Sequence, residues 1–122
     1  MISIIDDDES IREATRGLVR SLGYQATAFQ SAEDFLRSEG RDATSCVITD
    51  IQMPGISGLD LQDRLRGEGC STPIIFITAY PQERAKARAM KAGAIGFLGK
   101  PFDDQALIAC LDRALAEDGG RG

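Results

Sequence analysis

Histidine is absent from this chain of 122 residues. Its absence excludes imidazole-based zinc sites, Ser-His-Asp triads and histidine general bases. Cysteine is scarce: Cys46, Cys70 and Cys110 are an odd number and form no CxxC pair. We therefore expect three reduced thiols, with Cys46 and Cys110 in apolar surroundings.

Long apolar runs and a basic stripe are also missing. No segment approaches the roughly 20 apolar residues that span a bilayer, and no signal peptide precedes the first expected strand. The net charge of −5 argues against a bare nucleic-acid-binding module. We therefore expect a cytoplasmic protein without membrane contact or direct nucleic-acid binding. Length and composition fit one globular domain over residues 1–118, with a flexible tail or the start of a linker at 119–122.

Short apolar segments alternate with segments of helical periodicity along the whole chain. This alternation predicts an α/β domain with a doubly wound parallel sheet of five strands and five helices. Strands are expected at 2–5, 25–29, 46–49, 74–78 and 94–98. Helices are expected between Asp8 and Gly23 (capped by Asp8 or Ser10), from Ser31, around 59–67, at 82–92, and along Leu107, Ile108, Leu111 and Leu115. The helix at 82–92 has few large apolar side chains, so we expect it to be loosely packed.

Unusual polar residues lie at the carboxyl ends of four of the expected strands. They are Asp6 and Asp7, Asp50, Thr78 and Lys100. In a doubly wound sheet, ligands bind beyond the carboxyl ends of the strands. Each residue alone has a plainer explanation, as a capping turn, a loop carboxylate, a backbone-bonded hydroxyl or a turn. Their shared position favours a single site.

The residue types at this site suit phosphoryl transfer. Three neighbouring carboxylates repel one another unless a cation lies between them. Mg2+ (or Mn2+) prefers carboxylate oxygens and keeps positions open for phosphate. Lys100 supplies a mobile positive charge and Thr78 a hydroxyl donor. The nucleophile would be Asp50, which would form an aspartyl-phosphate.

These residues also carry a family resemblance. Asp6-Asp7, Asp50, Met53-Pro54-Gly55, Thr78-Ala79 and Lys100-Pro101-Phe102 resemble the receiver domain of two-component response regulators in order and spacing. Other stretches resemble the FixJ-like subgroup: 31–33, 58–61, 76–78 and 89–94. The resemblance implies a flavodoxin-like fold with strand order 2-1-3-4-5. It also implies a signalling switch that is not an enzyme, beyond self-catalysed phosphoryl transfer and autodephosphorylation.

The resemblance assigns roles around the phosphoacceptor. Asp50 would receive the phosphoryl group from a histidine kinase or a phosphotransfer protein. Asp7 would bind Mg2+ directly and Asp6 largely through water. Asp50 and the main-chain carbonyl of Gln52 would complete the protein ligands.

The resemblance also assigns the read-out. Thr78 and Lys100 would contact the phosphoryl group, and a cis peptide before Pro101 would help to place the lysine. Phe97 would act with Thr78 as the switch, through packing alone because it has no hydroxyl. The face formed by 82–92, 94–98 and the last helix would repack and, in this subgroup, often dimerise. Transcription regulation is the expected output of a full-length protein.

Some residues depart from the subgroup's pattern, and two alternative functions also have to be considered. Tyr80 stands where histidine is common, and Pro81 follows where a small residue is usual, so we expect the phosphoryl lifetime and the mobility of this loop to differ from those of the subgroup. A haloacid-dehalogenase-type phosphatase needs an aspartate where this chain has Gln52. A degenerate receiver that only docks is the other alternative, and retention of the pocket residues argues against it. The segment 93–100 resembles a P-loop but is one residue too long.

Overall fold

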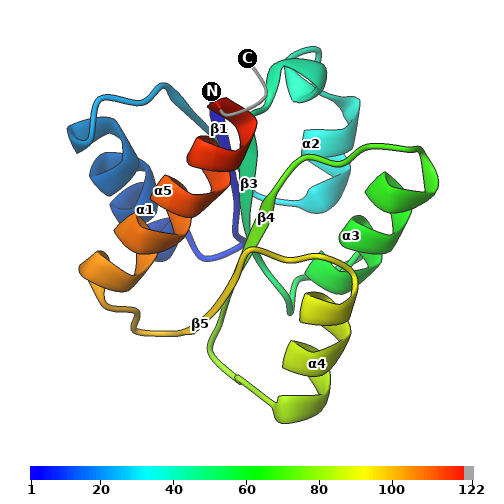
Figure 1. Cartoon of the computed structure of the whole chain (residues 1–122). Helices are drawn as coiled ribbons and strands as arrows, with labels where there is room; N and C mark the ends of the chain where they lie inside the picture. The colour runs from blue at the N-terminus through cyan, green and yellow to red at the C-terminus, as the bar shows by residue number, and fades with distance from the viewer. Residues whose placement is uncertain (120–122) are drawn as a thin grey trace.

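The computed structural model describes residues 1–119, so residues 120–122 of the expected tail lie outside the described residues. A parallel sheet of five strands lies at the centre, in the order β2-β1-β3-β4-β5 (Figure 1). The fold class and strand order expected from the sequence are confirmed. The strands are β1 Ile2–Ile5, β2 Ala26–Phe29, β3 Cys46–Asp50, β4 Ile74–Thr78 and β5 Gly96–Gly99. The helices are α1 Glu9–Ser21, α2 Ala32–Arg37, the 3-10 turn η1 Arg41–Ala43, α3 Gly58–Gly67, α4 Glu83–Lys91 and α5 Asp104–Gly119.

Helices cover both faces of the sheet, and each face has its own core. Side chains alternate between the faces along each strand, so Ile4 and Ile48 lie on one face and Ile5 and Val47 on the other. On the first face α1 and α5 pack against the sheet, and on the second α2, α3 and α4 do so (Figure 1). The most apolar strands, β3 and β4, are buried along their whole length.

Several element boundaries differ from the sequence prediction by one or two residues. Strand β5 begins at Gly96 rather than at Ala94, because the Ala94 N–H donates to the Ala89 carbonyl and so closes the end of α4. Gly93, with φ +95°, makes this turn possible. Of the two caps expected for helix α1, the structure has Asp8, since the Asp8 side chain accepts from the Ile11 N–H. Helix α5 continues to Gly119, one residue beyond the expected domain end.

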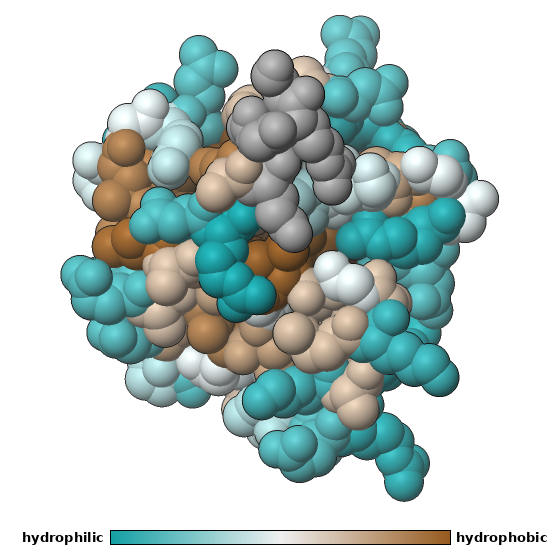
Figure 2. Space-filling model, in the orientation of Figure 1, coloured by the Kyte–Doolittle hydropathy of each residue, from teal (hydrophilic) through white to brown (hydrophobic). Residues whose placement is uncertain are grey.

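Helix α4 buries little of its surface against the sheet, and it forms hydrogen bonds and ion pairs with its neighbour α3. Within α4 only Ala89 is buried, and its outer surface is mainly hydrophilic (Figure 2). The buried side chain of Gln62 in α3 donates to the Ala89 carbonyl at 3.1 Å. Arg88 forms ion pairs with Asp60 and Asp63 of α3. The expected loose packing of this helix agrees with its single buried residue, and its described ion pairs are formed with α3.

Helix α5 places a different set of side chains in the core than the periodicity indicated. Leu107 and Leu111 are fully buried as expected, whereas Ile108 and Leu115 are only partly covered. Cys110 and Ala114 complete the buried stripe. Within residues 1–119, no helix combines the length and apolar character that a bilayer crossing would require.

The three thiols are free, and their burial predicts different reactivities. Burial raises the pKa of Cys46 from 9.0 to about 12, and it also raises the pKa of Cys110. Because the thiolate is the reactive form, we expect iodoacetamide at pH 8 to modify the half-buried Cys70 well before the other two. Peptide mass spectrometry measures the order of labelling, and urea-unfolded protein should label evenly. Even labelling of the native protein would contradict the prediction.

The same shift predicts a loss of stability at alkaline pH. The pKa of Cys46 is higher in the folded than in the unfolded chain, so its neutral thiol contributes stability that is fully present below pH 9.0. That contribution is lost as the pH rises through about 12. A Cys46→Ala variant should lack this part of the alkaline decline in urea unfolding.

Candidate functional site

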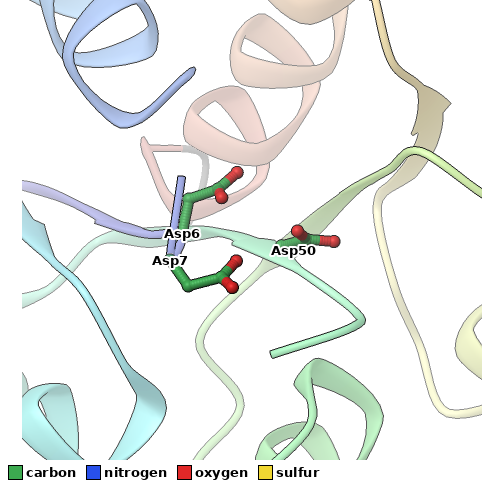
Figure 3. A group of neighbouring side chains, drawn as sticks. All are labelled: Asp6, Asp7 and Asp50. Carbon is green, nitrogen blue, oxygen red and sulfur yellow. The ribbon is translucent and has the colours of Figure 1, made fainter. Parts of the chain in front are cut away.

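Three carboxylates meet at the carboxyl edge of the sheet. β1 and β3 are neighbours, with Ile5 opposite Thr49, so Asp6 and Asp50 leave the sheet side by side. One carboxylate oxygen from each of Asp6, Asp7 and Asp50 lies within 4.8 Å of the others (Figure 3). Asp6 and Asp50 are buried, whereas Asp7 is exposed and leaves the group open to solvent. The structure therefore brings together the three acidic residues that the sequence analysis singled out.

Backbone donors fix the orientation of the Asp50 carboxylate. Oδ1 accepts from the Ile51 N–H at 2.6 Å and from the Gln52 N–H at 3.3 Å. The second oxygen, Oδ2, accepts from the Lys100 ammonium at 3.0 Å. One oxygen is thus held by the loop after β3, and the other faces the acidic group and the lysine.

Lys100 lies between two of the carboxylates. Its Nζ is 2.8 Å from Asp6 Oδ2 and 3.0 Å from Asp50 Oδ2. Its backbone N–H donates to the Thr78 carbonyl at 2.7 Å, which ties the end of β5 to β4. The peptide bond from Lys100 to Pro101 is cis, as expected.

Burial and neighbouring charges shift the pKa values of Asp6 and Lys100. Burial raises the pKa of Asp6, and this outweighs the lowering by Lys100 and by the Asp8 N–H. Burial lowers the pKa of Lys100, but its hydrogen bonds and charge interactions with Asp6 and Asp50 outweigh that effect, so the net shift is upward. Three carboxylates lie together at this site and only Lys100 is described as pairing with them, which favours a further cation.

Within residues 1–119, the Thr78 side chain forms no hydrogen bond with the carboxylates or with the Lys100 ammonium, and Phe97 lies on β5, next to β4. The buried Thr78 hydroxyl accepts from the Tyr80 N–H at 3.1 Å. The Phe97 ring is half-buried on β5 and lies 6.4 Å from the Phe76 ring, centroid to centroid. Tyr80 itself is 62% exposed. The main-chain carbonyl of Gln52, expected to be a metal ligand, remains a prediction.

Two residues that support the pocket escaped the sequence analysis as site residues. Arg12 of α1 donates to the Asp6 carbonyl at 2.8 Å and so holds the turn after β1. Gly58, the first residue of α3, lies so close to the Asp50 carbonyl that a side chain would collide with this backbone oxygen. Glycine at the start of a helix is a weak signal in sequence. Its meaning becomes clear only from the close approach to β3.

The fold and the pocket indicate a class of protein, and comparison of the sequence with known families identifies that class. The family model for the response regulator receiver domain matches residues 2–112. The chain belongs to this family, the receiver domains of two-component response regulators.

Individual relatives agree with this assignment. Nodulation protein W of Bradyrhizobium diazoefficiens is 42% identical over 97% of this chain and 52% of its own length. Transcriptional regulatory protein FixJ of Azorhizobium caulinodans is 38% identical over 99% of this chain and 57% of its own. The structure of response regulator StyR superposes with a TM-score of 0.89 at 41% identity, covering 98% of this chain and 61% of StyR. The resemblance to FixJ is confirmed, and the chain spans about half the length of these curated relatives.

The pocket fits the divalent cation that receiver domains generally bind at their acidic site. Magnesium favours hard oxygen ligands, and one or two carboxylates plus water usually suffice. The three carboxylate oxygens within 4.8 Å of one another meet this requirement. The exposed Asp7 leaves the carboxylates open to solvent on one side.

Proposed function

We propose that this chain is a phosphorylation-dependent switch in which Asp50 receives a phosphoryl group from a histidine kinase or a phosphotransfer protein. The observation that carries the proposal is the Asp50 carboxylate, with one oxygen held by two backbone N–H groups and the other facing Lys100. The free electron pair of that second oxygen forms the new bond to phosphorus as the bond to the donor's leaving atom breaks. The product is an aspartyl-phosphate.

The neighbouring residues would neutralise the charge that gathers during this transfer. Mg2+ (or Mn2+) would be held by Asp7 directly, by Asp6 largely through water, by Asp50 and by the Gln52 carbonyl. When bound, it supplies positive charge to the phosphoryl oxygens. Lys100 would move from the carboxylates to a phosphoryl oxygen, because Asp50 loses its free carboxylate charge on phosphorylation.

Thr78 and Phe97 would transmit the change to the surface. For the Thr78 hydroxyl to reach a phosphoryl oxygen, it must leave the Tyr80 N–H. Phe97 would then repack, and the face of α4, β5 and α5 would follow. The weak burial of α4 supports this shift in populations. Unchanged amide shifts on that face after phosphorylation would overturn this read-out.

The partners and the output follow from the same proposal. The phosphorylated face would form a homodimer or contact another partner, and the output would be transcription regulation in a longer protein, as the name of FixJ indicates for that relative. We infer that the chain works in the cytoplasm. Direct nucleic-acid binding by this chain is not part of the proposal, since its net charge is −5.

Incubation with acetyl phosphate and Mg2+ tests the central step. We expect intact-mass spectrometry to show one added phosphoryl group that is absent in Asp50→Asn. Asp60→Asn is the matched control, because Asp60 is exposed on α3 and contacts only Arg88 among the described ion pairs. Turnover of many phosphoesters without a stable adduct would instead indicate a phosphatase. A wild-type chain that forms no adduct would indicate a docking module.

A further inference from the structure

A carboxylate outside the acidic pocket holds the loop that follows β3. Glu33, in the first turn of α2, accepts a hydrogen bond from the Ile56 N–H through Oε2 at 3.2 Å. Its Oε1 atom is buried and has no hydrogen-bond partner within residues 1–119. An acidic residue in a first turn would serve the helix dipole equally well if it were exposed. Burying a carboxylate oxygen without a hydrogen-bond partner costs free energy. The interaction of Glu33 with the helix dipole does not require this burial, so the contact with the loop indicates its role.

The backbone of the loop is shaped to receive this carboxylate. Gly55 has φ +81°, a conformation that glycine adopts readily. A side chain at Gly55 would also collide with the Glu33 carboxylate. Within the described part of the chain, the bond from Ile56 to Glu33 is the only hydrogen bond of residues 53–56. Glu33 is therefore the one polar anchor of the loop's outer half.

The inner half of the same loop faces the pocket. Its first two N–H groups, from Ile51 and Gln52, donate to Asp50. The Gly58 N–H closes the loop on the Ile51 carbonyl at 2.9 Å. A loop that is fixed at its neck and at its outer turn has little freedom in between. The position of the Gln52 backbone therefore depends on both attachments.

We propose that Glu33 is a positioning residue for the cation site: it holds the loop between β3 and α3 so that the Gln52 backbone faces the acidic pocket. This inference rests on the proposed function, because it takes the pocket to bind Mg2+. Outer residues that orient metal ligands typically affect metal affinity by roughly tenfold to a hundredfold. Glu33 would act through the loop backbone, without touching the cation.

Three substitutions at Glu33 separate its reach, its charge and its hydrogen bond. Glu33→Gln removes the charge but keeps a hydrogen-bond acceptor on a side chain of the same length. Glu33→Asp keeps the charge on a side chain that is one methylene shorter. Glu33→Ala removes the charge and the acceptor. The control is Asp34→Asn, which removes a charge from the same helix at a side chain that pairs with Arg37 rather than with the loop. Mg2+ affinity is measured by calorimetry or amide shifts, and urea unfolding in chelator checks that each variant is folded.

We expect Glu33→Ala and Glu33→Asp to weaken Mg2+ binding by about tenfold or more. Glu33→Gln should keep most of the wild-type affinity, and Asp34→Asn should match the wild type. Unchanged affinity in a folded Glu33→Ala protein, or a Glu33→Gln protein as weak as Glu33→Ala, would overturn the proposal.

Amide hydrogen exchange in chelator separates this inference from the proposed function. The Ile56 and Gln52 amides should exchange faster in Glu33→Ala than in the wild type, whether or not Mg2+ binds. A wild-type chain that binds no Mg2+ would contradict the proposed function, while faster exchange would still support the anchoring of the loop. Unchanged exchange of both amides would overturn that anchoring.

Discussion

Lys100→Met is expected to lower the free energy of unfolding of the metal-free protein by about 3 kcal/mol. The lysine is the cation between Asp6 and Asp50, and its side chain is only 12% exposed. Removing one member of a buried ion pair typically costs about 3–5 kcal/mol, and we take the lower end because the pocket is open at Asp7. The variant leaves three neighbouring carboxylates without a cation. Urea unfolding in the presence of a chelator measures the loss.

Magnesium and pH should change the size of this loss in defined directions. Mg2+ replaces the missing positive charge and no longer competes with the lysine, so the difference between the two proteins should shrink as Mg2+ is added. The pKa of Lys100 is raised above 10.5 in the folded protein, so its contribution is fully present below pH 10.5 and is lost as the pH rises through the raised value. Lys86→Met, at an exposed position of α4, is the control for the loss of one positive charge. If Mg2+ left the difference in unfolding free energy between the wild type and Lys100→Met unchanged, this would argue against a cation among the three carboxylates.

Gly58→Ala is expected to destabilise the protein by about 2 kcal/mol or more. In most helices the exchange of glycine for alanine is favourable by roughly 0.5–1 kcal/mol. At Gly58 the sign reverses, because the new methyl group would collide with the backbone oxygen of Asp50 rather than with a movable side chain. The start of α3 or the end of β3 must then shift. Thermal or urea unfolding measures the effect on stability.

Gly67 provides the matched control for this substitution. It lies at the other end of α3, is exposed, and has no atom within 4 Å of the place where a side chain would begin. Gly67→Ala should therefore leave stability unchanged or raise it by up to about 1 kcal/mol. Gly58→Ala should also weaken Mg2+ binding, whereas Gly67→Ala should not. Equal stability of the two variants would show that α3 can retreat from β3 without cost.

The layered fold could be predicted from sequence because its strongest signals are local. β3 and β4 are apolar throughout, and such strands belong inside a parallel sheet. The start of β5 could not be predicted in the same way. Ala94 and Ile95 are apolar enough for a strand, but the Ala94 N–H is used to close α4. Competition between two elements for one backbone group leaves no trace in hydrophobic periodicity.

The candidate site was predictable only where its residues follow strands directly. Asp6, Asp50 and Lys100 each stand at a strand end, so the topology alone brings them together. Glu33 is 23 residues from its partner Ile56 and reaches it through a side-chain conformation. Sequence spacing carries no information about such a contact. Residues that act through the backbone of a distant loop therefore need a structure to be found.

The strand order also sets the sequence in which the pocket can be completed. β1 pairs with β2 and β3, and the sheet then extends to β4 and finally to β5. In a chain made from its N-terminus, the strand that leads to Lys100 is the last to become available. The acidic residues at the ends of β1 and β3 can thus become neighbours before their lysine has been synthesised. Until Lys100 has been made, ions from the solvent would have to balance the charge that this lysine balances in the complete chain.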